Sequence, residues 1–193
     1  MLCPSCAIKG PATLPGTLLQ HTEIPLVSVF SYHTQANHIL LSLKFRGTRN
    51  AAHSIGYAMG EAASRILEQP SDWLFCCVPM LEQQQRQRGY NQSALLANVA
   101  ARWIGADCEN ALLRKQRKTK TQHDLPAHLR ESNVKNAYVL ADPDAATKIG
   151  SRGIVICDDI VTTGATLRAC VDALQTAGFN RIVCLTYLRT EDA

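Results

Sequence analysis

Hydrophobic residues along the chain alternate between short continuous runs and longer segments with helical spacing. Continuous runs predict buried strands at about residues 72–78, 153–157 and 181–187, with a further short strand at 26–32. Apolar residues three and four positions apart predict helices at about residues 39–47, 49–67, 91–104 and 165–177. Residues 82–89 are polar and are predicted to form a loop. Strands that alternate with helices of this length predict βαβ crossovers, and hence an α/β fold whose parallel sheet is flanked by helices.

The first thirty residues have a different pattern. They contain four prolines, no helical periodicity, and a Cys-x-x-Cys motif formed by Cys3 and Cys6. We therefore predict a small irregular N-terminal module over residues 1–30 and a main domain over residues 31–193. The spacing of the two cysteines is that of a zinc knuckle, but structural zinc usually has four ligands, so this motif supplies only half of a Zn²⁺ site.

Composition excludes several classes of protein and leaves a globular one. The 193 residues are 46% hydrophobic and 19% charged, which argues against a disordered chain, a collagen-like repeat or a coiled-coil rod. The formal net charge of +4 is too small to indicate nucleic acid binding by itself. The longest apolar run, residues 73–78, is far shorter than the about 20 residues that span a bilayer. We expect neither a membrane helix nor a secretory signal.

Most of the eight cysteines indicate a reduced compartment. Five of them fall inside apolar segments that are predicted to be core: Cys76, Cys77, Cys157, Cys170 and Cys184. Small buried thiols are common in proteins of reducing compartments, where disulfides are rare. A cytoplasmic location is therefore expected.

The segment 154–166 has the densest set of functional side chains. A buried strand is followed by Asp158 and Asp159, which would lie at the carboxyl edge of the sheet, where open α/β folds bind ligands. A loop of small residues then opens a helix, and helix N-termini bind anions. This pattern predicts a phosphate in the loop and a polyhydroxyl group or Mg²⁺ at the carboxylates. The loop residues are Thr162, Thr163, Gly164, Ala165 and Thr166.

A purely structural interpretation of this segment is the alternative. Asp158 and Asp159 would cap a turn, and Thr162 or Thr163 would be the N-cap of the following helix. Capping requires one such residue, whereas the segment has two carboxylates and three threonines, so the ligand-binding interpretation is favoured.

Residues 155–166, with the sequence VICDDIVTTGAT, resemble the PRPP-binding motif of type I phosphoribosyltransferases. The wider chain resembles the ComF/GntX branch of that fold, whose proteins are associated with competence (DNA uptake) or DNA utilisation. This narrower resemblance rests on LKFRG at 43–47, on Val78-Pro79 with RQRGYNQ at 86–92, and on Thr121-Gln122 with Leu125, Arg130 and Asn133-Val134. It covers about residues 25–190 in consistent order and implies a phosphoribosyltransferase domain.

The resemblance implies a role for each part of the motif. Asp158 and Asp159 would be the catalytic acids that bind the ribose hydroxyls, directly or through Mg²⁺. Residues 162–166 would bind the 5′-phosphate of PRPP. Arg86 and Arg88 would face pyrophosphate, and a mobile hood loop over residues 115–125 would close over the reacting centre. The pyrophosphate and hood-loop candidates are Arg86, Arg88, Arg117, Lys118 and Lys120.

One departure from the resemblance limits the acceptor base. In 6-oxopurine phosphoribosyltransferases the position of Thr162 holds an acid that serves the purine N7, and a threonine cannot replace it at neutral pH. Hypoxanthine and guanine are therefore expected not to be substrates. An assay for nucleotide formation from PRPP and either base checks this, and turnover at ordinary enzymatic rates would contradict it.

Two further features keep several interpretations open. Relatives commonly have two cysteine pairs before the domain, whereas one is visible here, so the chain starts downstream of its true start, has lost the site, or completes it with another chain. Five cations lie within residues 114–120. They form a solvated loop, contribute to the hood loop, or contact nucleic acid.

Two functional hypotheses result. The first is Mg²⁺-dependent binding of PRPP or a similar phosphorylated ribose, with phosphoribosyl transfer if the protein is an enzyme. The second is a non-catalytic accessory protein in DNA uptake or utilisation that senses a nucleotide or binds DNA. The expected partners are the phosphorylated ribose, DNA or DNA-handling proteins, and a second copy of the chain in a homodimer, without a membrane.

Overall fold

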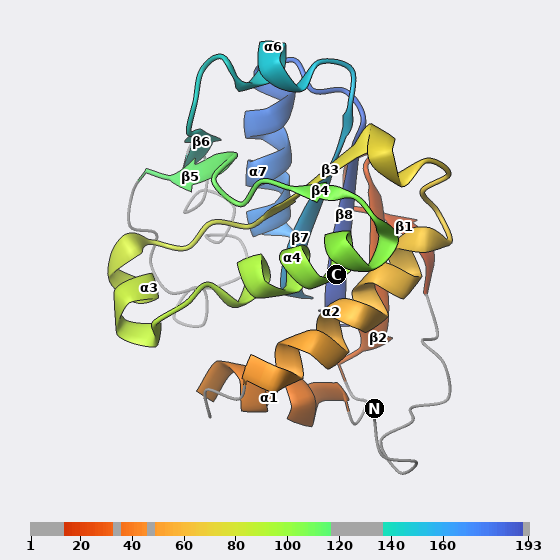
Figure 1. The fold of residues 1–193 in the computed structure, drawn as a ribbon, viewed down its shortest axis with the longest axis vertical. Helices are drawn as coiled ribbons and strands as arrows, with labels where there is room; N and C mark the ends of the chain where they lie inside the picture. Colours follow the sequence, from red (N-terminus) through yellow and green to blue (C-terminus); the bar gives the residue numbers. More distant parts are fainter. Residues whose placement is uncertain (1–13, 33–35, 46–48, 117–136, 191–193) are drawn as a thin grey trace.

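The computed structural model describes residues 14–32, 36–45, 49–116 and 137–190. Most of these residues belong to one six-stranded sheet and the helices that cover it (Figure 1). The elements, in chain order, are β1 (Leu14–Leu18), β2 (Pro25–Ser31), α1 (Ala36–Phe45), α2 (Arg49–Ser64), a 3₁₀ turn (Pro70–Asp72), β3 (Trp73–Cys77), α3 (Glu82–Arg88), α4 (Gln92–Ile104), β4 (Asp107–Cys108), β5 (Leu113–Lys115), β6 (Tyr138–Leu140), α6 (Ala145–Ile149), β7 (Gly153–Val161), α7 (Ala165–Thr176) and β8 (Ile182–Arg189).

The main sheet has the strand order β1-β2-β8-β7-β3-β4. Strands β2, β8, β7, β3 and β4 are parallel, and β1 is antiparallel to β2 at the edge. Strand β7 therefore lies inside the sheet, paired with β8 on one side and with β3 on the other. This confirms the predicted parallel sheet flanked by helices, and it brings the carboxyl end of β7 to the middle of one sheet edge.

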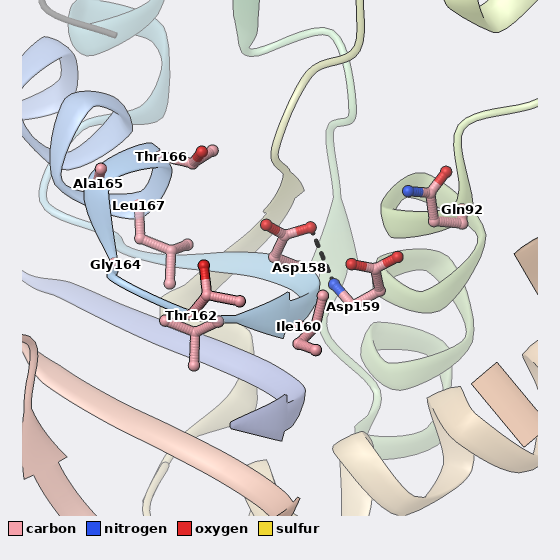
Figure 2. A pocket seen from close by; sticks show the side chains of 10 residues that line it. Gln92, Asp158, Asp159, Ile160, Thr162, Gly164, Ala165, Thr166 and Leu167 are labelled. Atoms are coloured by element: carbon pink, nitrogen blue, oxygen red, sulfur yellow. Dashed lines mark hydrogen bonds between the residues drawn. The ribbon is translucent and has the colours of Figure 1, made fainter. Parts of the chain in front are cut away.

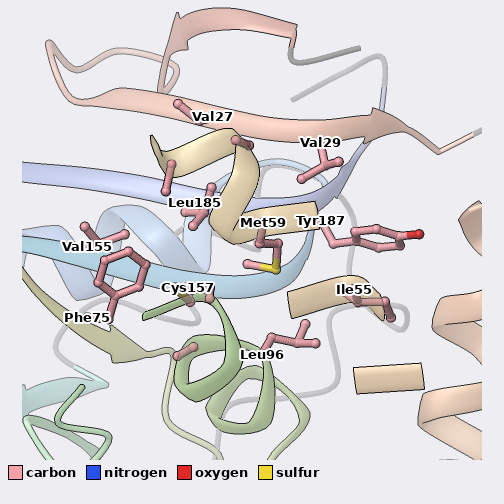
Figure 3. Packing of buried hydrophobic residues seen from close by; sticks show 14 of the residues in the cluster. Val27, Val29, Ile55, Met59, Phe75, Leu96, Val155, Cys157, Leu185 and Tyr187 are labelled. Atoms are coloured by element: carbon pink, nitrogen blue, oxygen red, sulfur yellow. The ribbon is translucent and has the colours of Figure 1, made fainter. Parts of the chain in front are cut away.

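Two hydrophobic cores lie on opposite faces of the sheet. Successive residues of a strand point to opposite faces, so Ile154 and Ile156 of β7 enter one core while Val155 and Cys157 enter the other. Helices α1, α2 and α4 cover the second face, where Phe75 packs with Met59 and Leu96 in the same cluster (Figure 3). Helix α7 covers the first face, together with the small antiparallel sheet of β5 and β6.

Helix α4 matches its sequence prediction closely. It begins at Gln92, and the side chain of Asn91 accepts a hydrogen bond from the Ser93 N–H at 3.0 Å, as an N-cap does. It ends at Ile104 with Gly105 in the left-handed conformation, at φ 77°. The predicted helix at 165–177 is likewise present as α7.

Two local predictions are wrong. Residues 82–88, predicted to be a loop, form helix α3, none of whose residues is buried. A helix that is polar on all sides has no hydrophobic period to indicate it. Strand β7 also continues to Val161, so Asp158 and Asp159 belong to the strand rather than to a turn after it. The Asp158 position pairs with Thr186 and that of Ile160 with Leu188 in β8, which keeps the strand extended.

The N-terminal segment contributes to the main sheet. Strands β1 and β2 fall within the proposed residues 1–30 module and its final strand, and β2 pairs in parallel with β8. Residues 1–13 lie outside the described residues, so a boundary near residue 30 stays a prediction. The five cysteines predicted to be core are all buried free thiols. Across the described part of the chain, no helix is both long and apolar enough to span a membrane.

Candidate functional site

The acidic pair ends a buried segment of β7. Asp159 is buried, with 3% of its surface exposed, and Asp158 is half-buried. The Asp158 Oδ1 accepts hydrogen bonds from the Ser93 hydroxyl at 2.8 Å and from the Asp159 N–H at 2.9 Å. Two neutral donors therefore hold the Asp158 carboxylate in one orientation, and the bond from Ser93 connects β7 to the start of α4.

The loop after β7 turns sharply into α7. Gly164 is the N-cap, with φ 73° and ψ −3°, a left-handed conformation that favours glycine. The first helical bond runs from the Arg168 N–H to the Gly164 carbonyl at 2.9 Å. The N–H groups of residues 165–167 precede this first helical bond, and they lie at the end of the helix dipole that attracts anions. The Ala165 N–H also donates to the Thr163 Oγ1 at 3.5 Å.

The side chains of Arg168 and Thr190 hold this loop through its backbone carbonyls. The Arg168 Nη1 donates to the Thr163 carbonyl at 2.9 Å. The Thr190 hydroxyl donates to the Thr162 carbonyl at 3.4 Å, which ties the loop to the end of β8. Because both contacts use backbone carbonyls, neither of them occupies an N–H group of the loop. The N-cap residue is Gly164, so the interpretation of Thr162 or Thr163 as the N-cap is wrong, although the Thr163 Oγ1 accepts a hydrogen bond from the Ala165 N–H at 3.5 Å.

A pocket of about 210 Å³ joins the two halves of the site. Figure 2 shows the acidic pair in its centre, with the loop and the start of α7 on one side and Gln92 of α4 on the other. It is lined by Gln92, Asp158, Asp159, Ile160, Val161, Thr162, Gly164, Ala165, Thr166 and Leu167. Of the predicted phosphate-binding residues, Thr163 is the one that is not part of this lining. The pocket thus combines a carboxylate pair with a helix N-terminus.

The antiparallel strands β5 and β6 lie beside α7, whose N-terminus lines the pocket. Strands β5 and β6 pair Lys115 with Tyr138, and the Lys115 Nζ lies 5.3 Å from the centre of the Tyr138 ring. Burial lowers the pKa of Lys115, while attraction to Asp158 acts in the opposite direction. Burial raises the pKa of Tyr138, whose side chain is hydrogen-bonded to Thr166. The Lys115 side chain therefore lies close enough to Asp158 to interact with it.

The two predicted pyrophosphate-binding arginines that the structure describes differ in their exposure and in their partners. Arg86 and Arg88 both lie in the last turn of α3. The Arg86 side chain is 82% exposed and bonds to Glu82 at 3.2 Å, whereas Arg88 donates to the Gln92 side chain at 2.7 Å. Arg117, Lys118 and Lys120 lie outside the described residues, as do Cys3 and Cys6, so the hood-loop and zinc predictions stay untested.

The structure adds several residues to the predicted site. Gln92 and Ser93 reach the acidic pair from α4, and Arg168 supports the loop. Gln92 lies in the RQRGYNQ segment that carries part of the family resemblance. Its place in the pocket, however, depends on the packing of α4 against β7. Arg168 follows the motif by two residues, and nothing in its sequence context distinguishes it from an ordinary surface cation of a helix.

The carboxylate oxygens of the pocket can coordinate a divalent cation only together with oxygens of a bound ligand. Two adjacent carboxylates suit Mg²⁺, which is usually held by one or two carboxylates together with substrate phosphates. Among the residues that the structure describes, no three or more His, Cys, Asp or Glu side chains group into a metal site. Asp158 and Asp159 would therefore hold Mg²⁺ jointly with oxygens of a bound phosphate compound.

Comparison with known proteins identifies the family. The phosphoribosyl transferase domain model matches residues 91–192, which include the acidic pair and the whole loop. Competence protein F of Haemophilus influenzae is 34% identical over 185 residues, which cover 93% of this chain and 75% of that protein. The chain belongs to the ComF/GntX family of phosphoribosyltransferase-domain proteins.

Other members of the ComF/GntX family show similar agreement. DNA utilization protein YhgH of Salmonella typhi is 34% identical over 173 residues, covering 86% of this chain and 74% of that protein. Its namesake in Escherichia coli K12 is 33% identical over 177 residues. Among solved structures, the allosteric regulatory enzyme of purine biosynthesis matches 69% of this ComF/GntX chain and 25% of its own, at 20% identity and a TM-score of 0.42.

Proposed function

We propose that this ComF/GntX-family protein binds PRPP or a related ribose 5-phosphate compound together with Mg²⁺. The observation that supports this most is the pocket itself, in which two carboxylates and the N-terminus of α7 face the same space. A phosphorylated ribose has the complementary groups, a phosphate at one end and two neighbouring hydroxyls on the ring. The phosphate would accept hydrogen bonds from N–H groups at the N-terminus of α7, and the hydroxyls would donate to Asp158 and Asp159.

The same arrangement suits transfer of the phosphoribosyl group. The bond between ribose C1 and a pyrophosphate oxygen breaks, the oxygen keeps the electron pair, and a nucleophile of the acceptor bonds to C1. Charge is positive on the sugar and negative on pyrophosphate in the transition state, so the carboxylates would stabilise the sugar and Lys115 the leaving group. Bound Mg²⁺ would supply further charge neutralisation for pyrophosphate. The acceptor is not defined by the pocket.

The names of the relatives favour a second candidate function. They include DNA utilization protein and competence protein F, which suggests a role in the use or uptake of DNA. In that role the domain would bind a ribose phosphate as a sensor, or assist a DNA-handling partner, without turnover. Both candidates use the phosphate-binding loop, but only the enzyme requires release of pyrophosphate.

Thermal unfolding with PRPP and Mg²⁺ tests the proposed binding. At a ligand concentration about 100-fold over Kd, one-site binding adds about 2.7 kcal/mol, or roughly 5–11 °C in Tm for a chain of this size. We expect this shift with Mg²⁺, a smaller one with EDTA, and none in the double variant Asp158→Asn/Asp159→Asn, which keeps the size of both side chains but removes their charge.

Pyrophosphate release then separates the two candidates. Release that depends on an added acceptor supports the transferase, and a thermal shift without release supports the sensor. No shift of the wild-type Tm at millimolar PRPP would contradict the proposed binding. A shift that persists in the double variant would show that the ligand binds elsewhere.

A further inference from the structure

Gln92 is a buried polar residue at the edge of the candidate site. It is the first residue of α4, only 8% exposed, and it lines the pocket beside Asp158 and Asp159. The next residue, Ser93, bonds directly to Asp158, so this end of α4 is fixed against the acidic pair. A buried amide of this kind needs hydrogen-bond partners for both its oxygen and its nitrogen.

Arg88 determines which end of the Gln92 amide faces the pocket. Its Nη1 lies 2.7 Å from the Gln92 Oε1. A guanidinium group can only donate, so the atom that it contacts must be the amide oxygen. The nitrogen, with two N–H donors, is therefore directed away from Arg88, and Figure 2 shows it on the side of the acidic pair. The pocket wall thus presents a donor next to two groups that can only accept.

We propose that the Gln92 amide donates a hydrogen bond to the C2 hydroxyl of the bound sugar and thereby selects ribose over 2-deoxyribose. This inference rests on the proposed function. A hydroxyl has one donor and two acceptor positions, so it can donate to a carboxylate and accept from an amide at the same time. A 2-deoxy sugar leaves the buried amide without that partner, which weakens its binding.

The position of Gln92 favours C2 over C3. The phosphate is attached to C5 and would lie at the N-terminus of α7, on one side of the acidic pair, whereas Gln92 lies on the other side (Figure 2). Around the ring, C3 adjoins C4, which bears the C5 group, and C2 lies one atom further away. Of the C2 and C3 hydroxyls, the one on C2 therefore reaches further from the phosphate towards α4.

Arg88 acts in this proposal as a positioning residue, and Arg86 offers a matched control. Both arginines lie in the last turn of α3 and have the same charge. Arg86 bonds to Glu82 on the surface, and both of those side chains are more than four-fifths exposed. Removal of Arg86 takes the same charge from α3 as removal of Arg88 does, but it leaves the Gln92 amide in place. Ribose 5-phosphate has no pyrophosphate group, so the role predicted for Arg86 does not enter this comparison.

The test compares the affinities for ribose 5-phosphate and 2-deoxyribose 5-phosphate, measured by calorimetry with Mg²⁺. We expect the wild type to prefer ribose 5-phosphate and Gln92→Leu to reduce that preference by about five- to tenfold, the effect of one lost hydrogen bond. Arg88→Ala should reduce it too, Arg88→Lys should retain more of it, and Arg86→Ala should leave it unchanged. Gln92→Glu, which keeps the acceptor for Arg88 but loses the donor, should behave like Gln92→Leu.

The outcomes distinguish this inference from the proposed function. If the wild type binds neither sugar phosphate nor PRPP, the proposed function fails and this inference fails with it. If the wild type binds ribose 5-phosphate and both Gln92 variants retain its full preference at unchanged Tm, only the role of Gln92 is overturned. An equal loss of preference in Arg86→Ala and Arg88→Ala would overturn the positioning role of Arg88, because charge alone would then explain it.

Discussion

Replacing Gly164 with alanine is expected to destabilise the protein by about 3 kcal/mol and to remove measurable binding of ribose 5-phosphate. Two costs add at this position. The φ of 73° is left-handed, and a Cβ there would lie 2.8 Å from the Leu19 Cδ1 and 3.1 Å from the Arg168 Nη1. Leu19 is 1% exposed and cannot move aside, so the loop would have to shift. That shift moves the N–H groups that would bind the phosphate.

Gly105→Ala is the matched control for this substitution. Gly105 is also left-handed, with φ 77° and ψ 25°, but a Cβ there would meet nothing within 4 Å. This variant should be destabilised by only about 1–2 kcal/mol, the conformational cost of a left-handed alanine, and should retain full affinity for ribose 5-phosphate. Urea unfolding and calorimetry with ribose 5-phosphate measure both effects. Equal destabilisation of the two variants would show that Leu19 and Arg168 yield to the new methyl group.

The parallel sheet and the acidic pair could be predicted because their signals are local. The run of apolar residues before Asp158 indicates a strand buried on both faces, and Asn91 and Gly105 mark the ends of α4. The small residues after the acids indicate a turn into a helix. Each of these inferences uses residues that are neighbours in the sequence, where a few propensities act in the same direction.

The other half of the site depends on contacts between distant segments. Ser93 and Asp158 are 65 residues apart, yet they share a hydrogen bond because α4 packs across β3 and β7. Leu19 meets Gly164 only because β1 and β2 join the sheet beside β8. Nothing in the local pattern of either partner indicates the other. The polar helix α3 was missed for a different reason, since neither core packing nor periodicity marks it.

Replacing Gly56 with valine is expected to destabilise the protein by about 3 kcal/mol, although the residue lies far from the acidic pair in sequence. Gly56 lies in α2 where this helix crosses α4. A Cβ there would be 2.5 Å from the Val99 Cβ and 3.1 Å from the Leu96 carbonyl oxygen. On an exposed helix, replacing glycine with valine would slightly stabilise the protein. The destabilisation expected here therefore comes from the close approach of α2 and α4.

The matched control is Gly60→Val, one turn further along α2. A Cβ at Gly60 would lie 2.8 Å from the Trp103 ring and 3.0 Å from both the Ala100 carbonyl oxygen and the Trp103 Cβ, so its closest contact is longer than the 2.5 Å at Gly56. Trp103 is also 50% exposed, so its ring has solvent to move into. This variant should lose less stability than Gly56→Val. Because Gln92 and Ser93 begin α4, displacement of that helix should also weaken the binding of ribose 5-phosphate in Gly56→Val, by about tenfold if one hydrogen bond is lost. Unchanged affinity in a destabilised Gly56→Val would mean that α4 yields at its C-terminal end, while the Ser93 bond to Asp158 holds its N-terminus in place.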